Sequence, residues 1–135
     1  MSRMKTLAAA LLLTSSPPAA GSDTASLSAT THPNLMDTMT VCAGRMSAEM
    51  EFAWLLSDPD ADWYQTQRLR FLDILTALGP APDPSHQLAL RIDAKMAHAG
   101  LLTTAHFGTD ATRAMWAKRH AVQQRMTCQT MLLDS

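Results

Sequence analysis

Residues 39–54, which read MTVCAGRMSAEMEFAW, decide the fold of this chain. Apolar side chains recur at every third or fourth position of this stretch, the spacing that places them on one face of an α-helix. The stretch also contains Cys42, one of only two cysteines, and three of the ten methionines in the chain. We therefore expect a helix here whose apolar face helps to build the core.

The length and composition of the chain allow one small domain. Of its 135 residues, 47% are hydrophobic and 17% are charged, values typical of globular rather than fibrous or disordered proteins. The sequence shows neither an alternating strand pattern nor an internal repeat. We therefore expect an all-α fold with a single core.

Capping and helix-breaking residues predict four helices. Their expected ranges are 33–57, 58–78, 83–107 and about 109–133. The start and stop signals are, in chain order, Pro33, Asp58-Pro59, Gly79-Pro80, Asp83-Pro84, Gly108 and either Thr109 or Asp110.

Short connectors between long helices favour an antiparallel, up-down-up-down four-helix bundle over residues 33–135. In that topology, Cys42 near the start of the first helix and Cys128 near the end of the fourth lie at the same height and face inward. We expect them to form one disulfide worth about 4 kcal/mol of stability. Two free thiols or an intermolecular bridge are the alternatives.

The first 22 residues predict export. Arg3 and Lys5 precede a short apolar run and a stretch of small residues, as in a secretory signal peptide with cleavage after Ala20 or Ser22. The run is too short to span a bilayer. Residues 23–32 are small and polar, which predicts a flexible leader. A periplasmic or secreted protein is expected, in a compartment where disulfides persist.

The charge of the expected mature chain argues against nucleic acid as a partner. Losing two of the 11 basic residues with the signal leaves nine against 12 acidic ones, a formal charge of −3. A nucleic-acid-binding protein normally carries a basic patch. No membrane association is expected after signal cleavage.

Aromatic side chains are expected to gather at the end of the bundle opposite the disulfide. They fill the core there or, in the functional interpretation, line a ligand or partner cleft with two cationic neighbours. The residues of this candidate site are Trp54, Trp63, Tyr64, His106, Phe107, Arg113 and Trp116.

The third expected helix has apolar residues on two opposite sides. The predicted inner stripe is Leu88, Ala89, Ile92, Met96, Ala99 and Thr103. The predicted outer stripe is Leu90, Ala94, Ala97 and Leu101. A helix that is apolar on two sides needs two packing partners, so the outer stripe is a candidate contact with a protein partner or a second copy.

The sequence gives only weak evidence for a catalytic, metal or cofactor site. Methionines with His98, His106 or His120 could bind copper or haem, but the motifs for covalent haem and for carboxylate metal centres are absent from the sequence. We expect no cofactor. Glu49 is expected to form a structural ion pair with Arg45, Lys118 or Arg125.

These patterns predict a small exported helical protein that acts by interaction or binding rather than catalysis. A small-ligand, haem or metal-binding bundle is the alternative, and an enzyme is the third possibility.

Overall fold

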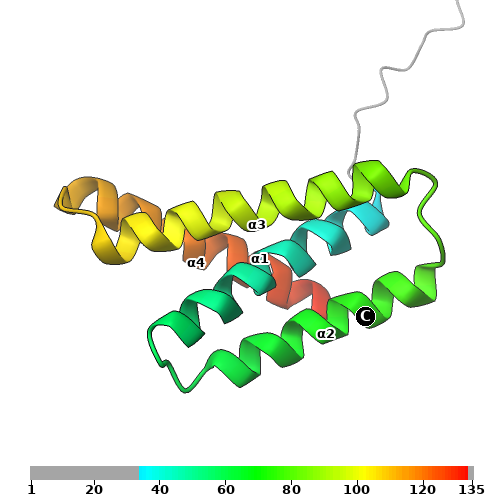
Figure 1. Ribbon diagram of the computed structural model, residues 1–135, viewed down its shortest axis with the longest axis horizontal. Coiled ribbons are helices and arrows are strands. Elements are labelled where there is room, and N and C mark those ends of the chain that lie inside the picture. Colours follow the sequence, from blue (N-terminus) through cyan, green and yellow to red (C-terminus); the bar gives the residue numbers. More distant parts are fainter. Residues whose placement is uncertain (1–33, 134–135) are drawn as a thin grey trace, which may run out of the picture. The chain divides into compact units, whose positions relative to one another are not determined.

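The computed structural model describes residues 34–133, which form four α-helices and, within that range, no strand (Figure 1). The helices are α1 (Leu35–Leu55), α2 (Ala61–Leu78), α3 (Pro84–Phe107) and α4 (Ala111–Leu133). The predicted all-α fold is confirmed. The predicted signal and leader lie outside the described residues. None of the four helices is long and apolar enough to cross a membrane.

Side-chain caps begin three of the helices close to the predicted positions. Asn34 Oδ1 accepts a hydrogen bond from the Asp37 amide at 2.7 Å, at the start of α1. Asp83 caps α3 in the same way, with Pro84 in the first turn, and Asp110 caps α4. The second helix begins at Ala61, later than predicted, because Asp58 turns the chain by accepting a hydrogen bond from the Asp60 amide.

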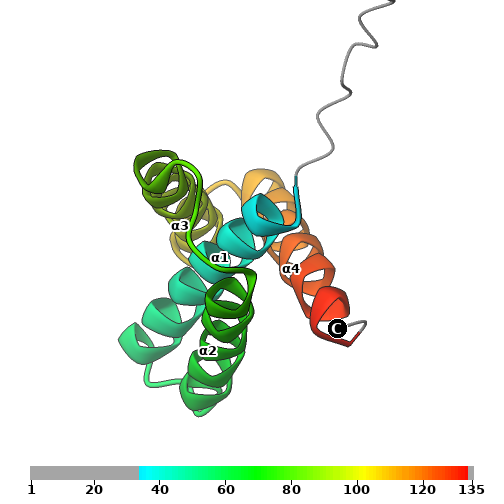
Figure 2. The same ribbon diagram turned by 90° about the vertical axis from the view of Figure 1, so that its right-hand side faces the viewer.

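Helix α1 is the central helix of the described residues. It packs along α2 and α3 and also contacts α4, whereas the backbones of α2 and α3 do not approach each other closely. Figure 2 looks along the helices and shows α2, α3 and α4 placed around α1. The predicted bundle expected α2 and α3 to be neighbours and α1 and α3 to be diagonal. In the structure α1 and α3 lie side by side and run in the same direction (Figure 1).

A close approach at Gly44 explains why α1 packs against α3. A Cβ atom added to Gly44 would lie 2.4 Å from the Arg91 carbonyl oxygen and 3.2 Å from Ala94 Cβ. Only glycine lets two helix backbones come this near. Ala43 and Ala48 are also buried and small, so other helices can pack closely against several sides of α1.

The predicted disulfide is confirmed. Cys42 and Cys128 are bonded with an S–S distance of 2.04 Å and a Cα–Cα distance of 5.4 Å. Both are fully buried. The bond ties the N-terminal half of α1 to the C-terminal part of α4, and together with Met46 and Phe71 the two cysteines belong to the main core.

The burial of the two apolar stripes of α3 differs from the prediction. Leu88, Ile92 and Met96, which were expected inside, are 57%, 49% and 64% exposed. Leu90, Ala94 and Leu101 of the predicted outer stripe are partly buried, and Ala97 is exposed. The physical reason is size, because the stripe that contains Ala94 can approach Gly44 whereas one built from leucine, isoleucine and methionine could not.

Candidate functional site

A groove runs over α1 between α2 and α3, the two helices whose backbones stay apart. It consists of two adjoining pockets of about 250 and about 200 Å³, which share Leu88 and Arg91 as lining residues. One pocket reaches from Met36 and Thr40 of α1 to Leu75 of α2. The other is lined by Ser47, Met50, Glu51, Arg68, Leu88, Arg91, Ile92 and Lys95. All three helices therefore contribute to one continuous lining.

The α3 wall of this groove combines apolar and basic side chains. Leu88 and Ile92 line it and are about half exposed, and Met96 continues their line along the helix. Arg91 and Lys95 stand beside them, one turn apart. Such an exposed apolar line bordered by polar groups is typical of interaction surfaces.

The charges in the groove are predominantly positive. Arg68 Nε donates to Ser47 Oγ at 3.0 Å, and Lys95 Nζ forms an ion pair with Glu51 Oε1 at 2.6 Å. Within residues 34–133, Arg91 has no carboxylate within ion-pair distance. Three cations thus face one carboxylate, so the groove favours an acidic ligand.

A second candidate is a buried polar cluster that joins α1, α3 and α4. His98 is fully buried, with Nε2 2.9 Å from Glu49 Oε1 and Nδ1 3.0 Å from Gln124 Oε1. Arg125 Nη1 lies 3.8 Å from Glu49 Oε2 and donates to the Tyr64 hydroxyl at 2.8 Å. Tyr64 extends the cluster to α2, so all four helices take part.

The hydrogen-bonding chemistry of this cluster is complete. An ionised Glu49 carboxylate only accepts, so Nε2 of His98 carries a proton and donates to it. Nδ1 either donates to the Gln124 oxygen from a doubly protonated ring or accepts from the Gln124 amide in its turned orientation. No buried side-chain nitrogen or oxygen within residues 34–133 lacks a partner. Glu49 and His98 at its centre are buried, whereas Arg125 is partly exposed. With its polar groups paired, the centre suits fixing the helices rather than reacting with a substrate.

Two groups near this region have shifted pKa values. Burial raises the pKa of the Tyr64 hydroxyl, and the Glu49 carboxylate raises it further, while Arg125 acts in the opposite direction. Burial lowers the pKa of the Arg45 guanidinium. Tyr64 and Arg125 also line an open pocket of about 350 Å³ with Asp60, Trp63 and Gln129.

The residues of the predicted aromatic end form separate groups. Phe52 contacts the rings of His106 and Phe107 in edge-on geometry, with centroids 5.7 and 6.1 Å away. Arg113 lies near Phe107, where both line a pocket at the turn between α3 and α4. Trp54 is half exposed.

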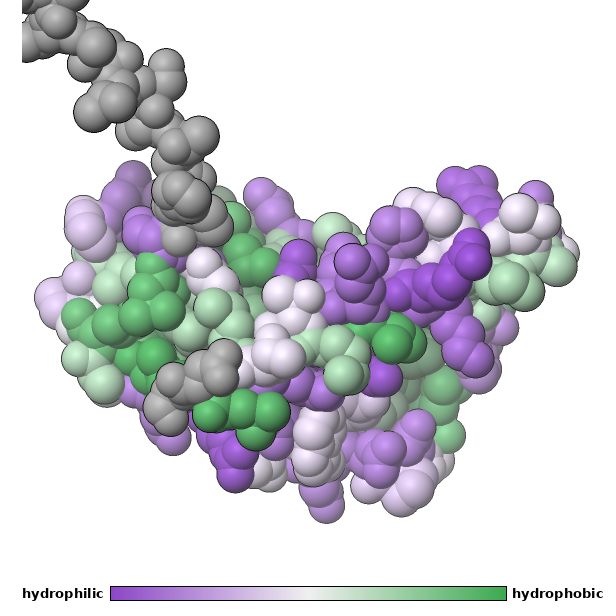
Figure 3. Space-filling model, turned by 180° about the vertical axis from the view of Figure 1, so that it is seen from behind, coloured by the Kyte–Doolittle hydropathy of each residue, from purple (hydrophilic) through white to green (hydrophobic). Residues whose placement is uncertain are grey.

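The other predicted aromatic residues lie elsewhere. Trp63 packs edge-on against Tyr64 at the start of α2. Trp116 contacts the tilted ring of His120, its neighbour one turn along α4. Figure 3 views the face that carries α4 and shows apolar residues gathering toward the side where that helix ends, with polar residues across much of the rest.

The predicted metal and haem ligands are placed apart or already bonded. Met46 is fully buried in the core, His98 is held by Glu49 and Gln124, and His106 packs between aromatic rings. Among the residues that the structure describes, no three His, Cys, Asp or Glu side chains lie close enough together to hold a metal ion.

Sequence reasoning named one of the two side chains that contact the Glu49 carboxylate. Arg125 was among the expected ones, whereas Arg45 contacts a disulfide sulfur and Lys118 is exposed on α4. The pairing with His98 and the basic groove were missed. The available signal for the groove was the Arg91 and Lys95 pair beside the apolar residues of α3.

Comparison with known proteins gives no relative from which a role could be transferred, since no family model, no curated protein and no solved structure matches this chain.

Proposed function

We propose that this protein is an exported binding protein that holds an acidic, amphipathic helix of a partner protein in the groove between α2 and α3. One observation carries the proposal, namely that exposed apolar side chains line the groove beside an arginine with no carboxylate partner. Apolar burial supplies affinity to such a site, and the positive charges select the partner.

The proposed partner is a helix because the groove lies where a helical bundle would hold a further helix. Helix α1 makes its floor, and α2 and α3 make its walls with their backbones apart. A further helix laid over α1 would complete a bundle around it. Its apolar stripe, spaced at three and four residues, would cover Leu88 and Ile92, and flanking Asp or Glu residues would face Arg68 and Arg91.

Export is part of the proposal. The supporting observations are the signal pattern in residues 1–22 and the disulfide, which persists in oxidising compartments. Mass spectrometry of the protein from fractionated cells should find a mature chain that begins at Gly21 or Asp23, outside the cytosol. Full-length protein in the cytosolic fraction would contradict export.

Site-specific photo-crosslinking tests the binding groove. A photoreactive residue replaces Ile92 in the full chain, expressed in the cells that produce it, and replaces exposed Gln123 of α4 as the control. The Ile92 position should link to one segment that is amphipathic and acidic. Arg91→Glu should reduce that yield about ten-fold or more, whereas Arg119→Glu on α4 should leave it unchanged.

Two outcomes would overturn the groove assignment. Equal and unselective linking from positions 92 and 123 would show that the groove holds no defined partner. A link from position 92 to a second copy of the same chain would replace the partner helix with a homodimer contact.

A further inference from the structure

A separate pocket lies on another side of α1 and is lined by residues of α1, α3 and the C-terminal part of α4. Its volume is about 390 Å³, and Val41, Cys42 and Leu90 give it an apolar wall. Thr127 contributes from α4, and Arg45 is the one cation of α1 in the lining. None of these residues lines the groove between α2 and α3.

The positively charged Arg45 has no carboxylate partner within residues 34–133. Its guanidinium is partly buried, and that burial lowers its pKa. The polar contact that the structure gives it is Nη1 to the Cys128 sulfur at 3.9 Å, and a disulfide sulfur is a weak acceptor. Across residues 34–133, no carboxylate approaches Arg45 within ion-pair distance. A bound anion would supply the missing charge.

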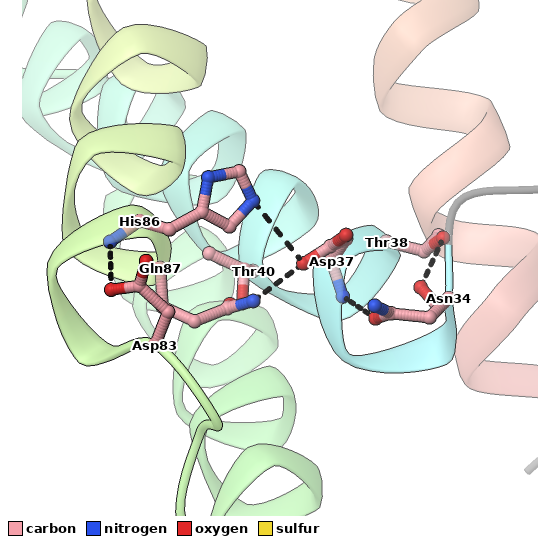
Figure 4. A network of polar contacts seen from close by, with 7 residues as sticks. All are labelled: Asn34, Asp37, Thr38, Thr40, Asp83, His86 and Gln87. Atoms are coloured by element: carbon pink, nitrogen blue, oxygen red, sulfur yellow. Dashed lines mark hydrogen bonds and ion pairs between the residues drawn. The ribbon is translucent and has the colours of Figure 1, made fainter. Parts of the chain in front are cut away.

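The opposite end of the pocket already has its polar partners. Figure 4 shows Gln87 and His86 of α3 both reaching toward the Asp37 carboxylate. Gln87 Nε2 donates to Asp37 Oδ1, and His86 Nε2 lies 3.9 Å from the same oxygen. The Asp37 carboxylate repels an anionic group at that end. Asp37 and Arg45 are two helical turns apart, about 12 Å at 1.5 Å per residue.

We propose that this pocket binds a small aliphatic monocarboxylate. The carboxylate accepts hydrogen bonds from the Arg45 guanidinium, the geometry in which arginine binds oxyanions best. The aliphatic chain lies against Val41, Leu90 and the buried disulfide. Arg45 attracts the carboxylate and Asp37 repels it, so the ligand lies with its carboxylate at the Arg45 end of the pocket.

Isothermal titration of the intact, disulfide-bonded chain tests this site, with octanoate as the probe and hexanoate and decanoate as length variants. Octanoate should bind one per chain. Acetate, which lacks the chain, and octan-1-ol, which lacks the charge, should each bind at least about ten-fold more weakly. Arg45→Gln should weaken octanoate binding by about ten- to a hundred-fold without affecting octan-1-ol.

Matched variants test whether octanoate binds in this pocket. Arg119→Gln, at an exposed position of α4, should bind octanoate like the wild type. Val41→Glu places a competing carboxylate beside Arg45 at a partly exposed position and should abolish binding while the chain keeps its helical circular dichroism. Absence of binding by all three carboxylates, or undiminished binding by Arg45→Gln or by folded Val41→Glu, overturns the proposal. The groove between α2 and α3 would be unaffected by that result.

Discussion

Helices α1 and α3 lie side by side and share many of the same residue types, but they are buried to very different extents. Eleven residues of α1 are buried, whereas His98 is the only buried residue of α3. The contrast extends to single residues, because Met46 of α1 is fully buried and Met96 of α3 is 64% exposed.

The difference follows from side-chain size. Gly44 and the neighbouring alanines of α1 let α2 and α3 approach on different sides, which encloses the larger residues between them. In this chain small residues, rather than the number of large apolar ones, decide which helix is central. Helix α3 offers one face to α1 and leaves its bulkier stripe to the groove.

The largest expected effect distinguishes two glutamate contacts that both join α1 to α3, a buried one at Glu49 and an exposed one at Glu51. Glu49→Ala should lower the free energy of unfolding by about 4 kcal/mol, because it leaves His98 buried without its anion and removes the anion facing Arg125. Glu51→Ala, which breaks the exposed pair with Lys95, should change it by less than about 1 kcal/mol. Urea denaturation with the disulfide intact measures both. Similar losses would show that burial does not distinguish the two pairs.

A pair of methionine substitutions tests the comparison directly. Met46→Ala should destabilise the protein by about 3 kcal/mol, because it opens a cavity in the core. Met96→Ala should stay within about 0.5 kcal/mol of the wild type, because its side chain is mostly in solvent. The difference between the two unfolding midpoints is the measurement. A large loss for Met96→Ala would show that the stripe of α3 is covered in solution.

Two glycines provide a third contrast, with effects of opposite sign. Gly44→Ala should cost about 2 kcal/mol, because the new methyl group meets the Arg91 carbonyl and forces the helices apart. Gly100→Ala should stabilise α3 by about 0.5–1 kcal/mol, because nothing lies within 4 Å of the added Cβ and alanine favours the helix. Thermal unfolding of both variants checks the signs. Stabilisation by Gly44→Ala would contradict the close contact.

The smallest expected effect is on the pKa of Tyr64, which tests whether the Glu49 carboxylate of α1 acts on this hydroxyl of α2. Tyr64 is the only tyrosine, so alkaline titration of tyrosinate absorbance measures it alone, and its midpoint should lie above the usual pKa of about 10. Glu49→Gln should lower that pKa and Arg125→Met should raise it. Folding favours the protonated hydroxyl, so its contribution to stability is present below about pH 10 and is lost as the pH rises through the raised pKa. A wild-type midpoint at or below 10 would contradict the burial of Tyr64.

Local signals in the sequence predicted the helices well. The caps at Asp83 and Asp110 and the stop at Gly79 act through neighbouring backbone atoms, so they can be interpreted without knowing the fold. The disulfide was predictable for a related reason. Helix lengths alone place Cys42 and Cys128 at similar heights once the first and fourth helices are taken as neighbours.

The choice of neighbours for each helix could not be predicted in the same way. Both stripes of α3 are apolar, and helical spacing does not say which of them meets α1. The groove could not be predicted either, because its lining depends on which stripe of α3 meets α1 and on α2 and α3 standing apart. The pairing of Glu49 with His98 was missed for the same reason, since the two residues are 49 positions apart and lie on helices that were expected to be diagonal.

The sequence by itself determined the four helices, their caps and the residues available for a disulfide, because these depend on local backbone chemistry and on spacing along the chain. The tertiary structure alone decided that α1 is central, that Leu88 and Ile92 face a groove, and that Arg45 stands without an anion beside an apolar pocket. Those properties depend on which helix surfaces can approach most closely, and a single glycine at position 44 decides that for α1 and α3.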